Sequence, residues 1–145
     1  YSIVRPPSFM ANLEANWESA TSGVYRTAFP GALFRHHIAP RDIGRIVSEA
    51  FDHPDGWVGR ELDIAGHFIS YAGIAAAMSR QLGRSVVYEQ IPWEEYTATA
   101  TPTAIAREAW YLANPVSVDM DALHEEFPWL MTVEEYLIDA GWAER

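Results

Sequence analysis

The chain has 145 residues, of which 49% are hydrophobic, and it carries a formal net charge of −10. This length and composition suit one compact domain, and the acidic balance disfavours direct contact with nucleic-acid phosphates. The absence of cysteine, of lysine and of any apolar run of about 18 residues excludes disulfides, thiolate chemistry, a catalytic lysine and a membrane-spanning helix.

The first third of the chain predicts a strand, a turn, a helix and a loop. Residues 2–4 are typical of a short buried strand, which an arginine and two prolines end. Phe9, Leu13 and Trp17 then fall on one face of a helix. Residues 21–33 are rich in Gly, Pro, Ser and Thr and predict an exposed loop. A strand that turns directly into a helix is typical of a nucleotide-binding fold.

Strands and helices then alternate as far as residue 91. Residues 32–39 and 59–66 predict strands, and residues 85–91 predict a third. Ser70 and Gly83 are the cap and the stop of the clearest helix. The helix between the first two strands has apolar residues at helical spacing, namely Ile43, Ile46, Val47, Ala50 and Phe51.

The remaining residues predict helices alone. They begin at Pro92 and continue at 101–114, 119–127 and 132–142, and Thr132 caps the last of them. The whole pattern predicts an α/β fold with a mixed or parallel sheet, flanking helices and a helical C-terminal segment. No repeat or long linker divides the chain, so residues 1–145 are expected to form a single domain.

Several segments stand in an order that resembles a known family. They are VRPPSFMANL, RDIGRIVSEAFDHP, GRELDIAG, ISYAGIAAAMSRQLGRSVVYEQIPWEEY and TVEEYLIDAGW. Their order and spacing resemble the C-terminal half of NmrA-like proteins, which are atypical short-chain dehydrogenase/reductase relatives with a Rossmann domain. The resemblance implies the C-terminal, substrate-side part of a Rossmann-like sheet. The chain has no GxxGxxG segment, so we expect the main dinucleotide-binding loop to be absent.

The resemblance also implies a cofactor and the residues that meet it. In the family the RPxxFxxN segment runs along the nicotinamide end of NAD(P)H, which assigns Pro7, Ser8, Phe9 and Met10 to cofactor binding. Asn12 closes this motif and is assigned to the substrate cleft. The alternative for Phe9 is structural, because this ring can simply pack the helix against the sheet.

Aromatic side chains of residues 17–34 extend the expected substrate cleft. By resemblance Trp17, Tyr25, Phe29 and Phe34 line it, and such rings suit a small, flat, hydrophobic ligand such as a quinone. Packing of this loop against the C-terminal helices explains the same residues equally well. His36 and its neighbour at 37 lie in a strand and point to opposite faces, so they cannot share a metal ion. His36 is assigned to the cleft, and no metal site is expected.

Catalytic residues stay unassigned. Short-chain dehydrogenases commonly use a Tyr-x-x-x-Lys pair, and no tyrosine here has a lysine partner. Asp42 is expected to stabilise the start of its helix rather than to react. The resemblance therefore leaves two hypotheses: an NAD(P)H-dependent oxidoreductase for a small carbonyl or quinone-like compound, and a non-catalytic redox sensor or interaction module. We expect a cytoplasmic protein that is inactive as this chain alone and that forms a homo-oligomer or pairs with another chain.

Overall fold

The computed structural model describes residues 1–144 and shows an α/β protein with short strands. The strands are β1 (Ile3–Arg5), β2 (Ser8–Phe9), β3 (Val24–Thr27), β4 (Phe34–Ile38), β5 (Glu61–Asp63), β6 (His67–Ser70) and β7 (Val87–Gln90). The helices are η1 (Met10–Asn16), α1 (Trp17–Thr21), α2 (Pro40–Asp52), α3 (Pro54–Trp57), α4 (Tyr71–Leu82), α5 (Trp93–Thr99), α6 (Pro102–Ala113), α7 (Met120–Glu126) and α8 (Val133–Asp139).

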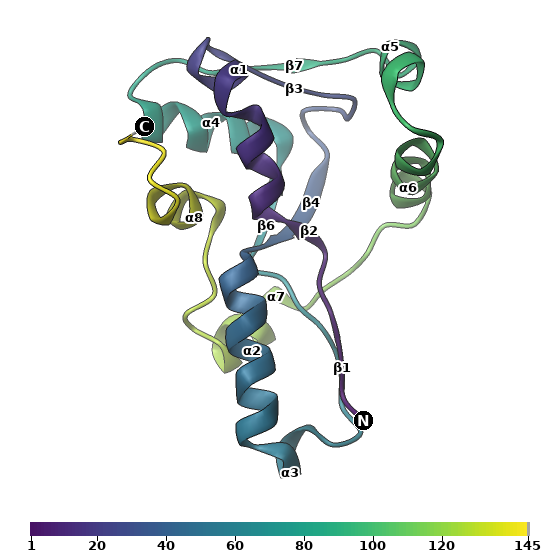
Figure 1. Ribbon diagram of the computed structural model, residues 1–145, viewed down its shortest axis with the longest axis vertical. Coiled ribbons are helices and arrows are strands. Elements are labelled where there is room, and N and C mark those ends of the chain that lie inside the picture. Colours follow the sequence, from purple (N-terminus) through teal and green to yellow (C-terminus); the bar gives the residue numbers. More distant parts are fainter. Residues whose placement is uncertain (145) are drawn as a thin grey trace.

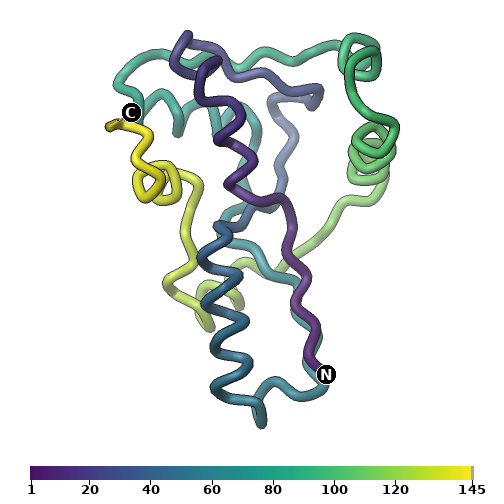
Figure 2. Tube along the Cα trace, in the orientation of Figure 1, coloured from purple at the N-terminus to yellow at the C-terminus, as the bar shows by residue number. Residues whose placement is uncertain are grey.

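The strands form three small sheets rather than one. β2, β4 and β6 make a three-stranded sheet at the centre of the molecule, parallel between β2 and β4 and antiparallel between β4 and β6. β1 pairs in parallel with β5 at one end, and β3 pairs in parallel with β7 at the other (Figure 1). Figure 2 shows β1, in purple, running beside the teal segment of β5. The predicted α/β class and its mixed sheet are therefore confirmed.

The N-terminal elements differ from their prediction in length and burial. The strand predicted at residues 2–4 occurs one residue later, and it is exposed rather than buried, because only one face of a two-stranded sheet is covered. The predicted helix begins as the tighter 3₁₀ helix η1. Met10 and Leu13, three residues apart, are its buried positions, while Phe9 is 40% exposed.

The loop predicted at residues 21–33 is partly a strand and partly buried. Within it, β3 runs parallel to β7, and Tyr25 and Phe29 are buried in the core. β3 has too few residues for a hydrophobic period to show, and its pairing partner lies far away in the sequence. The sequence therefore indicated a loop where tertiary pairing makes a strand.

The longer helices begin and end where the local signals place them. The side chain of Ser70 accepts a hydrogen bond from the backbone of Gly73 at 3.0 Å, and Gly83 ends α4 with a left-handed φ of 62°. α2 is also confirmed, but its apolar stripe is narrower than predicted. Val47 and Phe51 are exposed, because the helix buries only one side against its neighbours.

Two core clusters support these sheets. One gathers around α4, α8 and η1 and includes Met10, Ile74, Met78, Leu137 and Trp142. The other gathers around α2, α7 and the segment after β5 and includes Ile38, Ile46, Ile64 and Phe127. The central sheet lies between the two clusters.

Candidate functional site

A cavity of about 520 Å³ lies where β2, β3, β4, the start of α4 and α6 converge. Its volume falls within the range of about 300–1,000 Å³ that is usual for small-molecule sites. Six of the predicted site residues line it, namely Pro7, Ser8, Phe9, Asn12, Tyr25 and Phe29. The segment assigned to the cofactor and part of the aromatic segment assigned to the substrate therefore meet in one cavity.

Strand geometry places two further polar side chains in the same cavity. β4 alternates its side chains, so Arg35 and His37 share one face while Phe34 and His36 share the other. Arg35 and His37 line the 520 Å³ cavity. The rings of His36 and Phe68 stack on the opposite face, with centroids 4.3 Å apart.

Arg35 is the most connected side chain of the site. Its Nη1 donates a hydrogen bond to the hydroxyl of Tyr71 at 3.0 Å, and both terminal nitrogens donate to Oε2 of Glu108 at 3.2 Å. The guanidinium carbon lies 4.7 Å from the ring centroids of both Phe29 and Tyr111. Arg35 thus joins β4 to α4 and α6 by charge, hydrogen bonds and ring contacts together.

Glu108 on α6 is shared between two arginines. Its Oε2 accepts from Arg35, and its Oε1 accepts from Nε and Nη2 of Arg107 at 3.0 and 2.8 Å. Glu108 is buried, while the Arg107 side chain is 59% exposed. The pair of guanidiniums therefore outweighs the single carboxylate that lies between them.

Stacked and edge-on rings form the wall of the cavity behind Arg35. The rings of Phe29 and Tyr71 stack with centroids 5.1 Å apart, and Tyr25 meets Tyr88 edge-on at 5.7 Å. The hydroxyl of Tyr88 donates to the backbone oxygen of Phe29 and lies 2.6 Å from the hydroxyl of Thr27. Burial raises the pKa of Tyr71 to about 12, so its phenol is protonated at neutral pH.

His37 is buried with both of its ring nitrogens unpaired. Its residue is 3% exposed, and neither Nδ1 nor Nε2 has a hydrogen-bond partner among residues 1–144. Burial, aided by the positive charge of Arg35, lowers the pKa of His37 to about 3. The imidazole is therefore neutral, and it offers one donor and one acceptor in the wall of the cavity.

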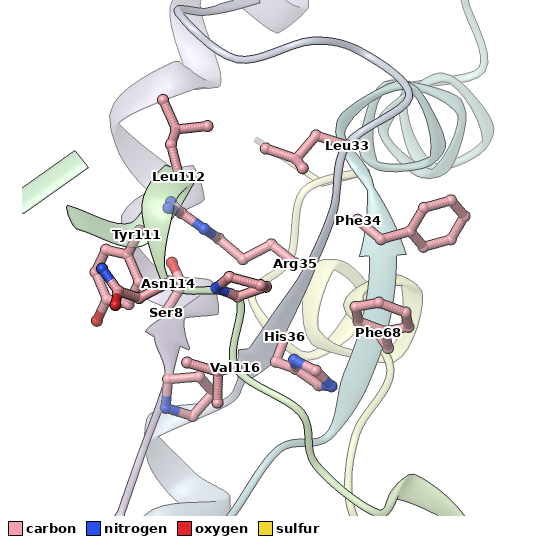
Figure 3. Close-up of a pocket in the computed structure, with 12 residues that line it drawn as sticks. Ser8, Leu33, Phe34, Arg35, His36, Phe68, Tyr111, Leu112, Asn114 and Val116 are labelled. Atoms are coloured by element: carbon pink, nitrogen blue, oxygen red, sulfur yellow. The ribbon is translucent and has the colours of Figure 1, made fainter. Parts of the chain in front are cut away.

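A second cavity of about 150 Å³ adjoins the first (Figure 3). The two share Pro7, Ser8, Arg35 and Tyr111 in their walls. Figure 3 shows Arg35 extending towards Tyr111, while Phe34 points away to the other side of the strand. The predicted cleft residues Phe34 and His36 line this smaller cavity rather than the larger one.

Two of the predicted site residues are not brought to either cavity. Met10 is fully buried in the core cluster around α4, because η1 turns its side chain inward together with Leu13. Trp17 packs at the edge of the same cluster, with its ring centroid 5.0 Å from that of Trp142. For Trp17, packing against the C-terminal helices is the arrangement that the structure shows.

Nine residues that line the larger cavity escaped the sequence prediction, and they include Arg35, His37, Tyr71 and Glu108. The alternation of β4 was a usable signal for two of them, since it places Arg35 and His37 on one face. Tyr71 and Glu108 carried no such signal, because Glu108 lies 73 residues from the arginine that it binds. Within residues 1–144, no group of three or more His, Asp or Glu side chains could hold a metal ion. No helix in this part of the chain is long and apolar enough to cross a bilayer.

Comparison with known proteins shows a family and a fold. The family model described as the NmrA-like family matches residues 1–137. Similar solved structures include a nucleoside-diphosphate-sugar epimerase from Staphylococcus aureus, at a TM-score of 0.71 and 21% identity over 92% of this chain and 50% of that chain. No curated protein matches the chain.

Two further solved structures have the same fold. NmrA, described as a negative transcriptional regulator in complex with NAD, aligns at a TM-score of 0.57 and 17% identity, over 83% of this chain and 42% of that one. A GalE-like L-threonine dehydrogenase from Cupriavidus necator, in its holo form, aligns at 0.60 and 19% identity, over 98% and 46%. These likenesses show a Rossmann-like fold, and the chain spans about half the length of the solved chains that it matches.

The family match corrects one expectation of the sequence. The assignment to the C-terminal half of the family is wrong, because the match begins at residue 1 and takes in the N-terminal part of this chain. The expected absence of the main dinucleotide-binding loop is likewise not confirmed, since that loop is an N-terminal feature.

Proposed function

Since this chain belongs to the NmrA-like family, we propose that its cavity is the substrate side of an NAD(P)H-dependent oxidoreductase for a small carbonyl or quinone-like compound. One observation carries this proposal. The cavity of about 520 Å³ joins Ser8 and Phe9, the segment assigned to the nicotinamide end, to the hydrogen-bonded pair of the partly buried Arg35 and the buried Tyr71. A pocket of this size with a few convergent polar groups is the usual form of a substrate site.

The residues around Phe9 fit the nicotinamide end of the cofactor. Structures of NmrA in complex with NAD and with NADP exist among the similar folds. Here Phe9 lines the cavity and is 40% exposed, so its side chain can cover a flat ring, and Ser8 in the same wall supplies a hydroxyl that can pair with a carboxamide. NAD(P)H supplies hydride when it is bound.

Tyr71 is suited to supply the proton that a carbonyl reduction consumes. Its oxygen accepts a hydrogen bond from Nη1 of Arg35, so the phenolic hydrogen can point towards a ligand oxygen. The pKa of about 12 keeps that hydrogen in place until a stronger base forms beside it. The charge of Arg35 then stabilises the phenolate, which is the role that a lysine has in short-chain dehydrogenases. The stacked rings of Phe29 and Tyr71 line the same space.

The first test is a calorimetric titration of the 145-residue chain with NADPH and then with NADH. We expect binding in the micromolar range. Steady NADPH consumption when a quinone or an aldehyde is added would then show that the chain is active by itself, against the expectation from its sequence. Tyr71→Phe keeps the ring and removes the proton, so it should lower kcat in the same assay with little change in the cofactor Kd. Failure to bind either dinucleotide would contradict the proposal.

Phe9→Ala tests the cofactor segment directly. Loss of one stacked ring should raise the NADPH Kd or lower turnover by about three- to tenfold. Phe51→Ala is the matched control, because Phe51 is 81% exposed and lines none of the cavities described above. If both variants keep the kinetics of the unaltered chain, Phe9 does not belong to the site.

A second candidate is a non-catalytic redox sensor that passes the state of a bound dinucleotide to a protein partner. The observation that favours it is the likeness to NmrA, which is described as a negative transcriptional regulator and not as an enzyme. A pull-down that recovers a partner with only one redox form of the cofactor would support the sensor. Steady consumption of NADPH with a quinone would support the enzyme.

A further inference from the structure

The larger cavity is positively charged within a strongly acidic chain. Arg35 and Arg107 line it, and Glu108 is the one acidic side chain among its described lining residues. This local excess of one positive charge stands in a chain of formal net charge −10. Side chains elsewhere on an acidic protein repel anions, so a positive cavity selects where an anion can bind.

Hydrogen bonding leaves part of this charge available to a ligand. The two oxygens of Glu108 are both occupied, one by Arg35 and the other by Arg107. Nε of Arg35 makes no hydrogen bond with the described residues, and the Arg107 side chain is 59% exposed. A guanidinium with open donors binds a carboxylate strongly, because both the charge and the fork geometry match.

His37 supplies a neutral donor on the same face of β4. His37 lines the cavity, its residue is 3% exposed, and neither of its ring nitrogens has a hydrogen-bond partner among residues 1–144. One nitrogen of the neutral ring carries a hydrogen that can bond to a ligand oxygen. A buried polar side chain without a protein partner is costly, and a ligand oxygen would satisfy it.

Part of the remaining wall is aromatic. Phe29 and Tyr71 stack behind Arg35, and Tyr111 flanks the guanidinium from α6. Flat rings of this kind pack well against a flat ligand, whereas a bulky saturated one would lose ring contact. Positive charge, a neutral donor and flat walls therefore coincide in one cavity.

We propose that the cavity recognises an aromatic carboxylate, held by Arg35 and Arg107 through the carboxylate and by the aromatic wall through the ring. This inference rests on the proposed function, whose substrates it narrows to small aromatic carbonyl compounds that carry a carboxylate. The oxygen to be protonated then lies towards Tyr71, and the carboxylate lies towards α6.

Benzoate and benzamide are the probes that test the charge separately from the ring. They share ring and shape but differ by one negative charge, and each is titrated calorimetrically into the full chain without dinucleotide. We expect benzoate to bind at least about tenfold more tightly than benzamide. Added salt should weaken benzoate binding and leave benzamide binding nearly unchanged.

Matched arginine variants locate the site. Arg107→Gln should abolish the preference for benzoate, while Arg41→Gln, the same change on a 64% exposed side chain outside the cavity, should retain it. Thermal unfolding measures whether each variant is folded. If Arg107→Gln is unfolded, the salt dependence of benzoate binding to the unaltered chain decides whether the carboxylate is bound through its charge.

Equal affinity for the two probes, failure of both to bind, or equal losses in the two variants would overturn the inference. None of these outcomes involves a dinucleotide. Binding and consumption of NADPH without a preference for benzoate would thus refute the carboxylate alone. A preference for benzoate without binding of NADPH would refute the proposed oxidoreductase.

Discussion

The charged and aromatic residues of the site are linked to their neighbours by hydrogen bonds, ion pairs and ring contacts. Arg35 has its charge compensated by Glu108, its Nη1 bound to Tyr71 and its faces covered by Phe29 and Tyr111. Removing any one partner changes the others, so effects of mutations here will not be additive. His37 differs, because its side chain has no hydrogen-bond partner among residues 1–144, so its effect on the free energy of unfolding can be measured by itself.

His37 should make stability depend on pH. Its pKa is lowered to about 3 by burial, whereas the unfolded chain titrates near about 6.5. The folded state thus binds fewer protons, and this contribution to stability is full above about pH 6.5 and is lost as the pH falls towards 3. In His37→Phe the loss of unfolding free energy between pH 7.5 and pH 5 should be smaller, as measured by urea unfolding.

His53→Phe is the control for this measurement, since that histidine is exposed and lies outside the cavities. The pKa values of His36 and His67 are also lowered, chiefly by burial, and both groups remain in each variant. The comparison therefore isolates His37. An unchanged pH dependence in His37→Phe would contradict the assignment of a buried neutral imidazole.

Local hydrogen bonds set where the helices of this chain begin and end. Its strands depend instead on pairing with segments that are distant in the sequence. α8 begins with a reciprocal cap, in which the Thr132 side chain accepts from the backbone of Glu135 and the Glu135 side chain accepts from the backbone of Thr132. Such a cap is readable from four residues. By contrast, β3 and β7 pair across some sixty residues, and neither is long enough to be stable alone.

Loss of the α8 cap should destabilise the whole chain, because α8 packs against α4 in the core. Thr132→Ala removes the side-chain acceptor and should lower the free energy of unfolding by about 1 kcal/mol. Thr132→Ser retains the hydroxyl and should stay close to the unaltered chain. Chemical denaturation measures both, and an equal loss in the two variants would mean that packing, not capping, is responsible.

The whole molecule carries apolar surface at the end that holds β1, β5 and α3. β1 and β5 pair only with each other among the described residues, so each has an open edge. Ile3, Phe51 and Val58 are exposed at this end, and the backbone of Gly59 bonds that of Tyr1. Open strand edges beside apolar side chains favour association between protein chains. The formation of an oligomer therefore stays a prediction, and this exposed end supports it.

Phe51→Ser tests that prediction at the scale of the assembly. The unaltered chain should sediment as a dimer or larger species at tens of micromolar, and Phe51→Ser should shift it towards the monomer. Ile138→Ser is the control, because this side chain is also apolar and exposed but lies on α8, away from this end. A monomeric mass for the unaltered chain across micromolar dilution would contradict the predicted oligomer.

The sequence by itself determined the structural features that depend on residues close together in the chain. The α/β class, the bounds of α2, α4 and α8 and the opposed faces of the adjacent histidines all follow from periods and caps within about a dozen residues. The segment at residues 7–9 was placed by its motif, and the structure brings it to a cavity with Tyr25 and Phe29.

Tertiary structure alone decided the rest. It turned Met10 into the core, made a strand of β3 and brought Glu108 to Arg35 in the wall of the cavity. These outcomes depend on contacts between residues far apart in the chain, for which a single sequence has no period or spacing to display. A charged pair across 73 residues is fixed by packing, because only the folded chain brings its two partners within hydrogen-bond distance.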